Sequence, residues 1–246
     1  MSEKVWGEIT TGSIFIADSH ESDHFGYLER LWGFLEAQSS EAPIFLMGDV
    51  FDLLFGGVEA SFAPHAELLR RISSLAQRRP LYWLEGNHDF NLSPFLEGIT
   101  VIGRESQPAL FRLGGERALL AHGDWKIGWG YEIYTKLIRN PWILKILNQM
   151  DQKRGGKIFE WVKARVSAKT LRVGPPCKAL SHQRLPLYQG KNAKWIFEGH
   201  FHSCGWVKEQ ETSYVALPSL ACNESYFVVE LNDNVVSIKE STLKES

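Results

Sequence analysis

Five short apolar runs in this chain of 246 residues each end directly at a group of Asp, Asn or His side chains. Such runs are typical of buried strands, and open α/β sheets bind ligands at the edge where parallel strands end. The runs 14–17, 44–47, 81–84, 118–121 and 195–197 precede Asp18-Ser19-His20, Gly48-Asp49, Gly86-Asn87-His88-Asp89, His122-Gly123-Asp124 and Gly199-His200-Phe201-His202. One Gly-Asp pair is usually only a turn, but five strand ends of the same layout predict a single site built from several loops.

The order of the expected elements indicates an α/β fold. Apolar residues recur at helical spacing over 25–38 and 64–79, and these two predicted helices alternate with the first three strands. A β-α-β-α-β order implies parallel strands with right-handed crossovers. Further short strands are predicted at 99–102, 109–113, 117–121, 195–198, 213–217, 226–231 and 235–238. A parallel half followed by an antiparallel half predicts two packed sheets flanked by helices, α/β in class and α+β in part.

Residues 125–190 differ in charge from the rest of the chain. They contain thirteen Lys or Arg and three acidic residues, a net charge of +10, whereas the remainder has a net charge of −12. Apolar stripes predict three helices here, broken at Gly155-Gly156 and ended by Pro175-Pro176. We therefore divide the chain into a first part of the core (1–124), a basic helical insert or lid (125–190) and a second part of the core (191–246).

Cysteine usage and hydropathy indicate the cellular compartment in which the protein is found. The three cysteines are scattered and odd in number, which argues against a disulfide framework and fits a reducing environment. No secretory signal is visible, and no run approaches the roughly 18 apolar residues of a membrane-spanning helix. We expect a cytoplasmic protein.

The five motifs together supply seven oxygen or nitrogen ligands and no thiolate. These are Asp18, His20, Asp49, Asn87, His122, His200 and His202. Such a set suits two divalent ions such as Mn, Fe or Zn rather than a Cys-based structural zinc site. Two ions about 3.5–4 Å apart need a bridging ligand, and we expect the carboxylate of Asp49 to bridge them. The alternative, that the histidines only satisfy local backbone groups, does not explain why five of eight lie at strand ends.

In this order, the motifs Asp-x-His, Gly-Asp-x-x-Asp, Gly-Asn-His-Asp, His-Gly and Gly-His-x-His resemble those of the calcineurin-like metallophosphoesterase family. The resemblance implies a two-sheet sandwich flanked by helices, and hydrolysis of a phosphate ester or anhydride by metal-activated water. It implies one ion held by Asp18, His20, Asp49 and His202, and a second held by Asp49, Asn87, His122 and His200. Mn²⁺ is the metal that we expect.

The same resemblance implies roles for the neighbours of the ligands. His88 is then the general acid or a phosphate ligand, and Asp89 is expected to orient it. Asp52 and Asp124 are expected to support the metal ligands.

The insert resembles, in position and character, the helical lid of bacterial UDP-2,3-diacylglucosamine diphosphatases within this family. The similarity implies cleavage of UDP-2,3-diacylglucosamine to UMP and 2,3-diacylglucosamine 1-phosphate in lipid A biosynthesis, at the anionic inner face of the cytoplasmic membrane. Apolar helix faces would hold acyl chains, and basic residues would meet the diphosphate and lipid headgroups. The candidate substrate-binding residues are Asn87, Trp125, Lys126, Trp129, Lys153, Arg154 and Lys157. The best-known members carry Arg where this sequence has His88.

Several alternatives stay open from the sequence. One alternative is that the apolar stripes of the insert pack on the body and its charges form a solvated face. Another is that the enzyme acts on another nucleotide or on a phosphoprotein. A nucleic-acid enzyme using the +10 insert would lose affinity steeply with salt, and we do not expect nucleic acid as the partner. A non-catalytic scaffold would be expected to have lost metal ligands, and all seven are present. No obligate protein partner is evident.

Overall fold

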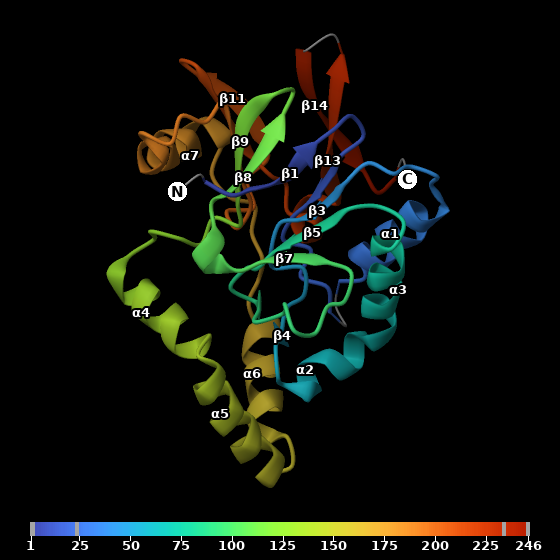
Figure 1. The fold of residues 1–246 in the computed structure, drawn as a ribbon. Coiled ribbons are helices and arrows are strands. Elements are labelled where there is room, and N and C mark those ends of the chain that lie inside the picture. The colour runs from blue at the N-terminus through green and yellow to red at the C-terminus, as the bar shows by residue number, and fades with distance from the viewer. Residues whose placement is uncertain (1–2, 23–24, 233–234, 245–246) are drawn as a thin grey trace.

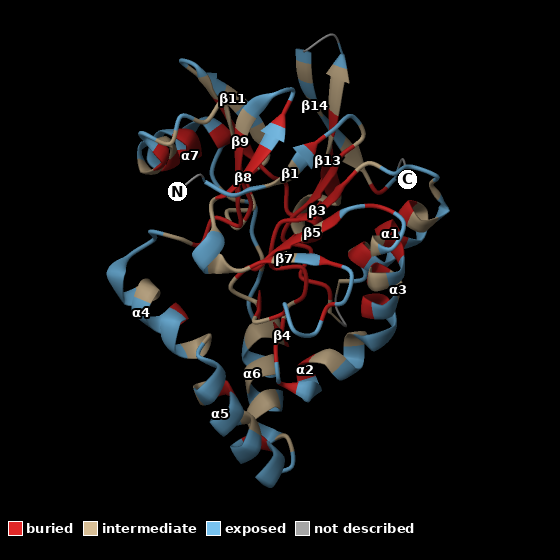
Figure 2. Ribbon diagram, viewed as in Figure 1, coloured by how far each residue is buried: buried red, intermediate tan, exposed pale blue. Residues whose placement is uncertain are grey.

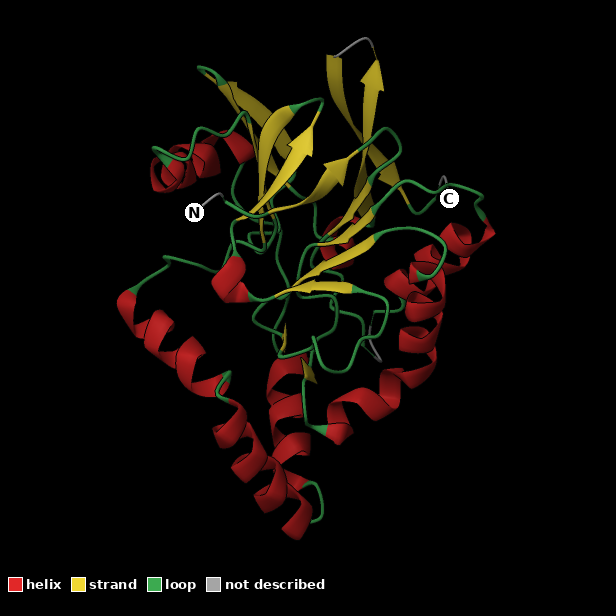
Figure 3. Ribbon diagram, in the orientation of Figure 1, coloured by secondary structure: helices red, strands yellow, loops and turns green. Residues whose placement is uncertain are grey.

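The structure is a computed structural model and describes residues 3–22, 25–232 and 235–244. Two six-stranded sheets pack together, with helices around them (Figures 1 and 3). The first sheet contains, in spatial order, β1 (Val5–Ile9), β8 (Ala109–Leu113), β9 (Glu116–Ala121), β10 (Trp195–Glu198), β12 (Thr212–Ala216) and β11 (Gly205–Glu209). The second contains β14 (Val235–Thr242), β13 (Ser225–Asn232), β2 (Ile14–Ile16), β3 (Ile44–Leu46), β5 (Leu81–Leu84) and β7 (Thr100–Ile102). A small third sheet pairs β4 (Leu54–Phe55) with β6 (Asp89–Phe90).

Aromatic side chains fill the space between the two large sheets. Phe15 of β2 stacks on Phe45 of β3, with ring centroids 4.5 Å apart, and on Phe197 of β10, at 4.7 Å. The neighbours of Phe45 along the strand, Ile44 and Leu46, belong instead to the apolar cluster that includes the helices. Both faces of β3 are therefore covered, which explains why this strand is a continuous apolar run. Figure 2 shows the buried residues concentrated in the strands.

The helices divide between the body and a projecting hairpin. They are α1 (Tyr27–Ala37), α2 (Glu59–Phe62), α3 (Ala66–Ala76), α4 (Trp129–Ile138), α5 (Pro141–Lys153), α6 (Lys157–Ser167), α7 (Cys177–Arg184) and α8 (Leu220–Asn223), with short 3₁₀ helices at Ala63–His65, Arg104–Ser106 and Leu185–Tyr188. Helices α1 and α3 cover the second sheet, and α7 packs on β11 and β12 of the first. Helices α5 and α6 form the hairpin, and together with α4 they extend away from both sheets (Figure 1).

The two packed sheets and flanking helices agree with the prediction, but the division into a parallel and an antiparallel half is wrong. Both sheets are mixed. In the first, β10 runs parallel to β9 and to β12 in the chain's second half. In the second, β2 runs parallel to β3 but antiparallel to β13. The β8–β9 hairpin does turn at Gly114 and Gly115, whose φ angles of 57° and 79° suit glycine. Sequence reasoning did not predict β1 and β11, which are edge strands with partly exposed side chains and therefore lack a continuous apolar run.

Candidate metal centre

All seven predicted ligands follow strands that end on the same side of the sandwich. Strands β2, β3 and β5 are parallel neighbours in the second sheet, and β9 and β10 are parallel neighbours in the first. In the described part of the chain, three groups have ligand atoms that all lie within 4.8 Å of one another. Two consist of predicted ligands, namely Asp18, His20 and His202, and Asp49, His122 and His200, and the third joins His20 to Asp52 and His88. The seventh, Asn87, places Oδ1 3.3 Å from Nε2 of His122. The structure thus brings the seven side chains together.

Backbone strain is concentrated at these same residues. Five of the seven have φ between 46° and 65°, in the left-handed region: Asp18, His20, Asp49, His200 and His202. Non-glycine residues rarely adopt this conformation, which costs about 1–3 kcal/mol each and is retained mostly at functional sites. The loops are therefore held in shapes that aim side chains at one point rather than in relaxed turns.

Two motif glycines are required by the space that the ligands occupy. A Cβ atom on Gly48 would lie 2.4 Å from Nδ1 of His122, and one on Gly86 would lie 2.2 Å from Oδ1 of Asp49. Both distances are far shorter than van der Waals contact. Glycine precedes Asp49 and Asn87 because any side chain there would displace a ligand.

Three histidines are oriented by a hydrogen bond at Nδ1. His20 Nδ1 lies 3.0 Å from Oδ1 of Asp52, His122 Nδ1 lies 2.9 Å from the carbonyl oxygen of Met47, and His202 Nδ1 lies 3.1 Å from that of Arg172. These acceptors fix the tautomer that leaves Nε2 available, as in metal sites. Nε2 of His20 is buried and has no hydrogen-bond partner. An orphaned ring nitrogen among carboxylates and imidazoles fits a divalent cation, so the residues present suit the expected metal.

The electrostatics of His122 and His200 also fit a cation. Burial would lower the pKa of His122, but the carboxylate of Asp49 outweighs it and raises that pKa to about 10. Burial and then the neighbouring His122 lower the pKa of His200 to about 3. Nδ1 of His200 is 3.2 Å from Nε2 of His122, so only one of the two can hold a proton. A divalent ion bound there would replace that proton.

His88 stands beside the ligands and faces a cavity. Its backbone N–H donates to Oδ1 of Asp49 at 2.8 Å, and its Nδ1 lies 2.8 Å from the carbonyl oxygen of Asp52. Its side chain lines a cavity of about 310 Å³ together with Asp52, Lys169 and Thr170. Sequence reasoning counted Lys169 only as part of the insert's charge, because its place beside His88 depends on how the segment after α6 crosses the site.

The expectation that Asp89 orients His88 is wrong. The carboxylate of Asp89 is fully buried and accepts hydrogen bonds from the backbone N–H groups of Asp49, Val50 and Gly86, at 2.7–3.0 Å. It also accepts from the indole N–H of Trp83 at 3.1 Å. Asp89 therefore joins the loops that follow β3 and β5. The ring of His88 is contacted instead by the backbone carbonyl of Asp52.

The side chains of Asp52 and Asp124, both expected to support the metal ligands, have different partners. The side chain of Asp52 contacts His20, as described above. Asp124 instead accepts from Nε of Arg104 at 2.9 Å, and Arg104 also pairs with Glu132 of α4 at 2.8 Å. No hydrogen bond or ion pair within the described residues joins the Asp124 carboxylate to a metal ligand. Asp124 ties the loop after β9 to the insert.

Most of the predicted substrate-binding residues lie away from the ligands. The Trp125 ring packs edge-on against Tyr188, at 5.2 Å, on the α7 side of the first sheet. The Lys126 ammonium lies 5.0 Å from the centre of the Trp125 ring, and Trp129 is 83% exposed. Lys153, Arg154 and Lys157 are exposed at the α5–α6 turn, which is the end of the hairpin farthest from the sheets (Figure 1). Of the predicted set, Asn87 alone is in the ligand cluster.

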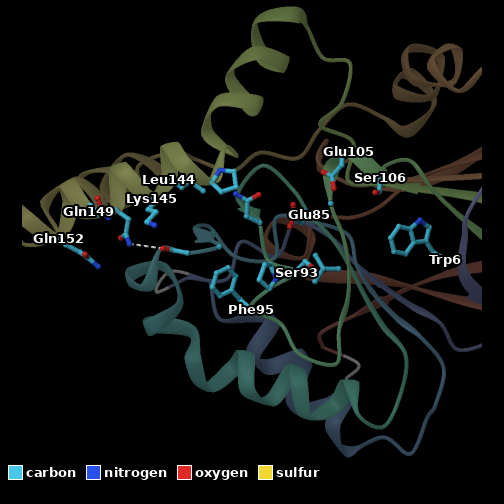
Figure 4. A pocket seen from close by; sticks show the side chains of 18 residues that line it. Trp6, Glu85, Ser93, Phe95, Glu105, Ser106, Leu144, Lys145, Gln149 and Gln152 are labelled. Atoms are coloured by element: carbon cyan, nitrogen blue, oxygen red, sulfur yellow. Dashed lines mark hydrogen bonds between the residues drawn. The ribbon is translucent and has the colours of Figure 1, made fainter.

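A hollow of about 820 Å³ lies between α5 and the loops near Glu85, Phe95 and Glu105 (Figure 4), and no metal ligand lines it. A smaller crevice of about 110 Å³ lies under the hairpin and is lined mainly by apolar side chains, including Phe55, Leu144 and Phe159. None of the seven metal ligands lines either of these two hollows.

In the residues described, no helix is both long and apolar enough to cross a membrane. The longest helix of the insert, α5, has thirteen residues.

Comparison with known proteins agrees with the geometry. The chain is 27% identical over 201 residues to a UDP-2,3-diacylglucosamine hydrolase of Photorhabdus laumondii, covering 77% of this chain and 81% of that protein. It is 28% identical over 196 residues to a protein of the same name from Pasteurella multocida, covering 76% and 81%. A solved structure from Streptococcus pneumoniae, described as a predicted phosphoesterase, aligns over 95% of this chain and 90% of that chain, with a TM-score of 0.47 and 13% identity.

A model of the family described as calcineurin-like phosphoesterase matches residues 13–204, a span that includes every predicted ligand from Asp18 to His202. The chain therefore belongs to the calcineurin-like phosphoesterase family of metal-dependent hydrolases.

Proposed function

We propose that this phosphoesterase hydrolyses the diphosphate of UDP-2,3-diacylglucosamine to UMP and 2,3-diacylglucosamine 1-phosphate, in lipid A biosynthesis, with two Mn²⁺ ions. The observation that carries the proposal is a row of hollows that leads from His88, next to the metal ligand Asn87, to the apolar crevice under the insert. Phe159 lines both the apolar crevice and a small middle cavity, and Asp52 and Ser167 line both the middle cavity and the His88 cavity. A substrate with a charged diphosphate and apolar chains matches this order. The distant relatives that bear the name of this activity support the same choice.

The ligand residues divide between the two ions as follows. Asp18, His20, Asp49 and His202 would hold one, and Asp49, Asn87, His122 and His200 would hold the other. Asp49 would belong to both sets, since its strand, β3, lies between β2 and β5. When bound, the ions neutralise phosphate oxygens and make water a better nucleophile. The protein's own part is to fix the ligand atoms and to bring the phosphate to them.

His88 and Lys169 meet the phosphate that leaves. Both line the cavity beside the ligand cluster, and the Nδ1 of His88 is engaged by the carbonyl of Asp52. Nε2 is then the atom of His88 that hydrogen-bonds the substrate. Lys169 supplies a positive charge near a group that is anionic before and after cleavage. Together they serve the role that Arg fills at the position of His88 in the best-known diphosphatases.

The insert brings the enzyme to the inner face of the cytoplasmic membrane as a peripheral protein. Its helices expose apolar side chains that no other element covers in the described residues: Trp129, Ile133, Tyr134, Leu137, Trp142, Ile146, Leu147, Met150 and Trp161. Figure 2 shows that most of α4 and α5 is exposed. The surrounding segment carries a net charge of +10. Exposed apolar side chains among basic residues are suited to an anionic lipid surface.

The test is hydrolysis across a panel of substrates with Mn²⁺, using mixed micelles for the lipids. The panel holds UDP-2,3-diacylglucosamine, the same UDP-sugar without acyl chains, other nucleotides, a phosphopeptide and an oligonucleotide. Because each buried CH₂ contributes about 0.8 kcal/mol, we expect kcat/KM to be at least about 100-fold higher for the diacylated substrate than for the unacylated sugar. Equal kcat/KM for the acylated and unacylated substrates would contradict the proposal and favour a phosphoesterase that acts on a nucleotide or phosphoprotein. Preference for the oligonucleotide would favour a nucleic-acid substrate.

A further inference from the structure

Strands β9 and β10 each end at a histidine of the same ligand group. They are parallel neighbours with Ala121 opposite Glu198, so His122 and His200 follow at nearly the same level. Nδ1 of His200 lies 3.2 Å from Nε2 of His122. The spacing of the two loops therefore decides where these two ligand atoms stand.

The two loops do not hold this spacing by themselves. His200 has a φ of 65° and Gly123 a φ of 119°, both unfavourable for most residues. A Cβ atom on Gly123 would lie 3.0 Å from the carbonyl oxygen of Gly199, so the loops already touch through their backbones. Such conformations persist only where the surroundings fix them. Support must come from outside the loops.

Arg184 of α7 provides this support from behind the ligand loops. Its Nε and Nη2 donate to the two carboxylate oxygens of Glu198, at 2.9 and 2.7 Å. Nη2 also donates to the carbonyl oxygen of Gly123, and Nη1 to that of Trp125, both at 3.1 Å. One planar guanidinium thus joins the last residue of β10 to the loop after β9. The compact ammonium of a lysine cannot reproduce this fork.

The arrangement is buried and fully paired around the carboxylate. Arg184 is 5% exposed and Glu198 is fully buried. The hydroxyl groups of Tyr188 and Tyr214 donate to Glu198 at 2.7 and 2.8 Å. The carboxylate therefore has a fixed position, and the guanidinium transmits that position to both loops.

Within the other ligand group, Asp18 accepts from the backbone N–H of His200 at 2.8 and 3.1 Å, whereas His202 and His20 have anchors of their own. The carbonyl oxygen of His202 accepts from the backbone N–H of Gly174 at 2.8 Å, and its Nδ1 lies 3.1 Å from the carbonyl oxygen of Arg172. His20 is held by Asp52, as described above. Loss of Arg184 should leave these contacts in place.

We propose that Arg184 is a positioning residue for the group of Asp49, His122 and His200. It fixes the separation of the two imidazoles, and it strengthens metal binding at that group more than at the other. The inference rests on the two-ion site of the proposed function.

The experiment is equilibrium dialysis against Mn²⁺ with metal analysis of the protein. We expect two ions in the wild-type protein, whereas Arg184→Lys retains one with little change in affinity and binds the second about 10–100-fold more weakly. A double variant, Arg184→Met with Glu198→Gln, removes both buried charges and should show the same split even if the lysine variant folds poorly. The control is Arg71→Lys, which disturbs a more exposed arginine–carboxylate pair, with Glu36, between α1 and α3 and outside the metal centre.

Different results separate the possible failures. Two ions bound at unchanged affinity in both Arg184 variants would overturn the inference. Parallel weakening of both ions, or the same split in Arg71→Lys, would show a general loss of stability and would overturn it as well. A folded wild-type protein that binds no Mn²⁺ would overturn the proposed function itself, and this inference with it.

Discussion

The Nδ1 atom of His20 lies 3.0 Å from Oδ1 of Asp52, and the Nε2 atom of the same ring is buried without a partner. His122 and His202 are oriented through backbone carbonyl groups, which substitution cannot remove. At His20 the acceptor is a side chain. This pair therefore gives direct experimental access to the orientation of a metal ligand.

We expect Asp52→Ala to weaken Mn²⁺ binding about 10–100-fold, because His20 loses the acceptor that fixes its tautomer. Asp52→Asn keeps an oxygen that can accept from Nδ1 and should restore most of the affinity. Equilibrium dialysis measures both. The control is Asp151→Ala, which removes a carboxylate that accepts from Ile158 and Phe159 in the hairpin. Wild-type affinity in Asp52→Ala would show that Asp52 does not orient the ligand.

His88 should act in turnover and not in metal binding. We expect His88→Ala to lose about 10²-fold or more in kcat, the range typical of a general acid, while it retains two ions. Steady-state rates and metal analysis of the same preparation separate the two effects. His182→Ala is the control, since His182 lies on α7 with a side chain that is 61% exposed. Near wild-type turnover in His88→Ala would remove His88 from the mechanism.

Asp89 should contribute to stability. An Asn side chain at this position has one acceptor oxygen, and its NH₂ group would face N–H donors, so at least one buried donor loses its partner. We expect Asp89→Asn to lower the free energy of unfolding by about 2–4 kcal/mol, measured by denaturant titration of the metal-free protein. Asp151→Asn is the matched control, because both of its N–H donors reach a single oxygen, Oδ1. Equal stability of the two variants would contradict this account.

The metal ligands could be predicted because each follows an apolar run within a few residues, so local sequence determines their place. The roles of Asp89, Lys169 and Arg184 depend on segments that approach from elsewhere in the chain. Asp89 receives N–H groups from the loops after β3 and β5, and Lys169 lines the same cavity as His88 only because the chain after α6 returns to that cavity. No periodicity or spacing reports such contacts.

The mixed sheets illustrate the same limit at the level of the fold. The parallel pairing of β10 with β9 joins residues that are separated by the entire insert. Short hairpins such as β8–β9 can be predicted from their turn, but a parallel pair across a long insertion has no local signal.

Membrane binding can be tested through the exposed tryptophans. We expect the protein to float with anionic vesicles and not with neutral ones, and the triple variant Trp129→Ala/Trp142→Ala/Trp161→Ala to lose most of that recovery. These indoles are 83%, 73% and 63% exposed, and the segment's charge attracts anionic lipid. The control is Trp206→Ala, on β11 of the body. Equal recovery with neutral and anionic vesicles, or none with either, would contradict peripheral binding.

The row of hollows also predicts which phosphorus water attacks. With acyl chains in the crevice near Phe159, the lipid-side phosphate would lie beside His88 and Lys169, and the nucleotide-side phosphate would lie over the metal ligands. Attack must occur in line with the leaving oxygen, so the leaving group would be 2,3-diacylglucosamine 1-phosphate. This product is a stable anion, and a hydrogen bond from His88 suffices to assist its departure.

Hydrolysis in ¹⁸O-labelled water distinguishes the two directions by mass spectrometry of the products. We expect the label in UMP, with the lipid phosphate unlabelled. An unlabelled UMP and a labelled lipid phosphate would reverse the orientation of the substrate and place the nucleotide-side phosphate beside His88. The control is incubation of each unlabelled product with the enzyme in labelled water, because exchange after cleavage would mimic attack at either position.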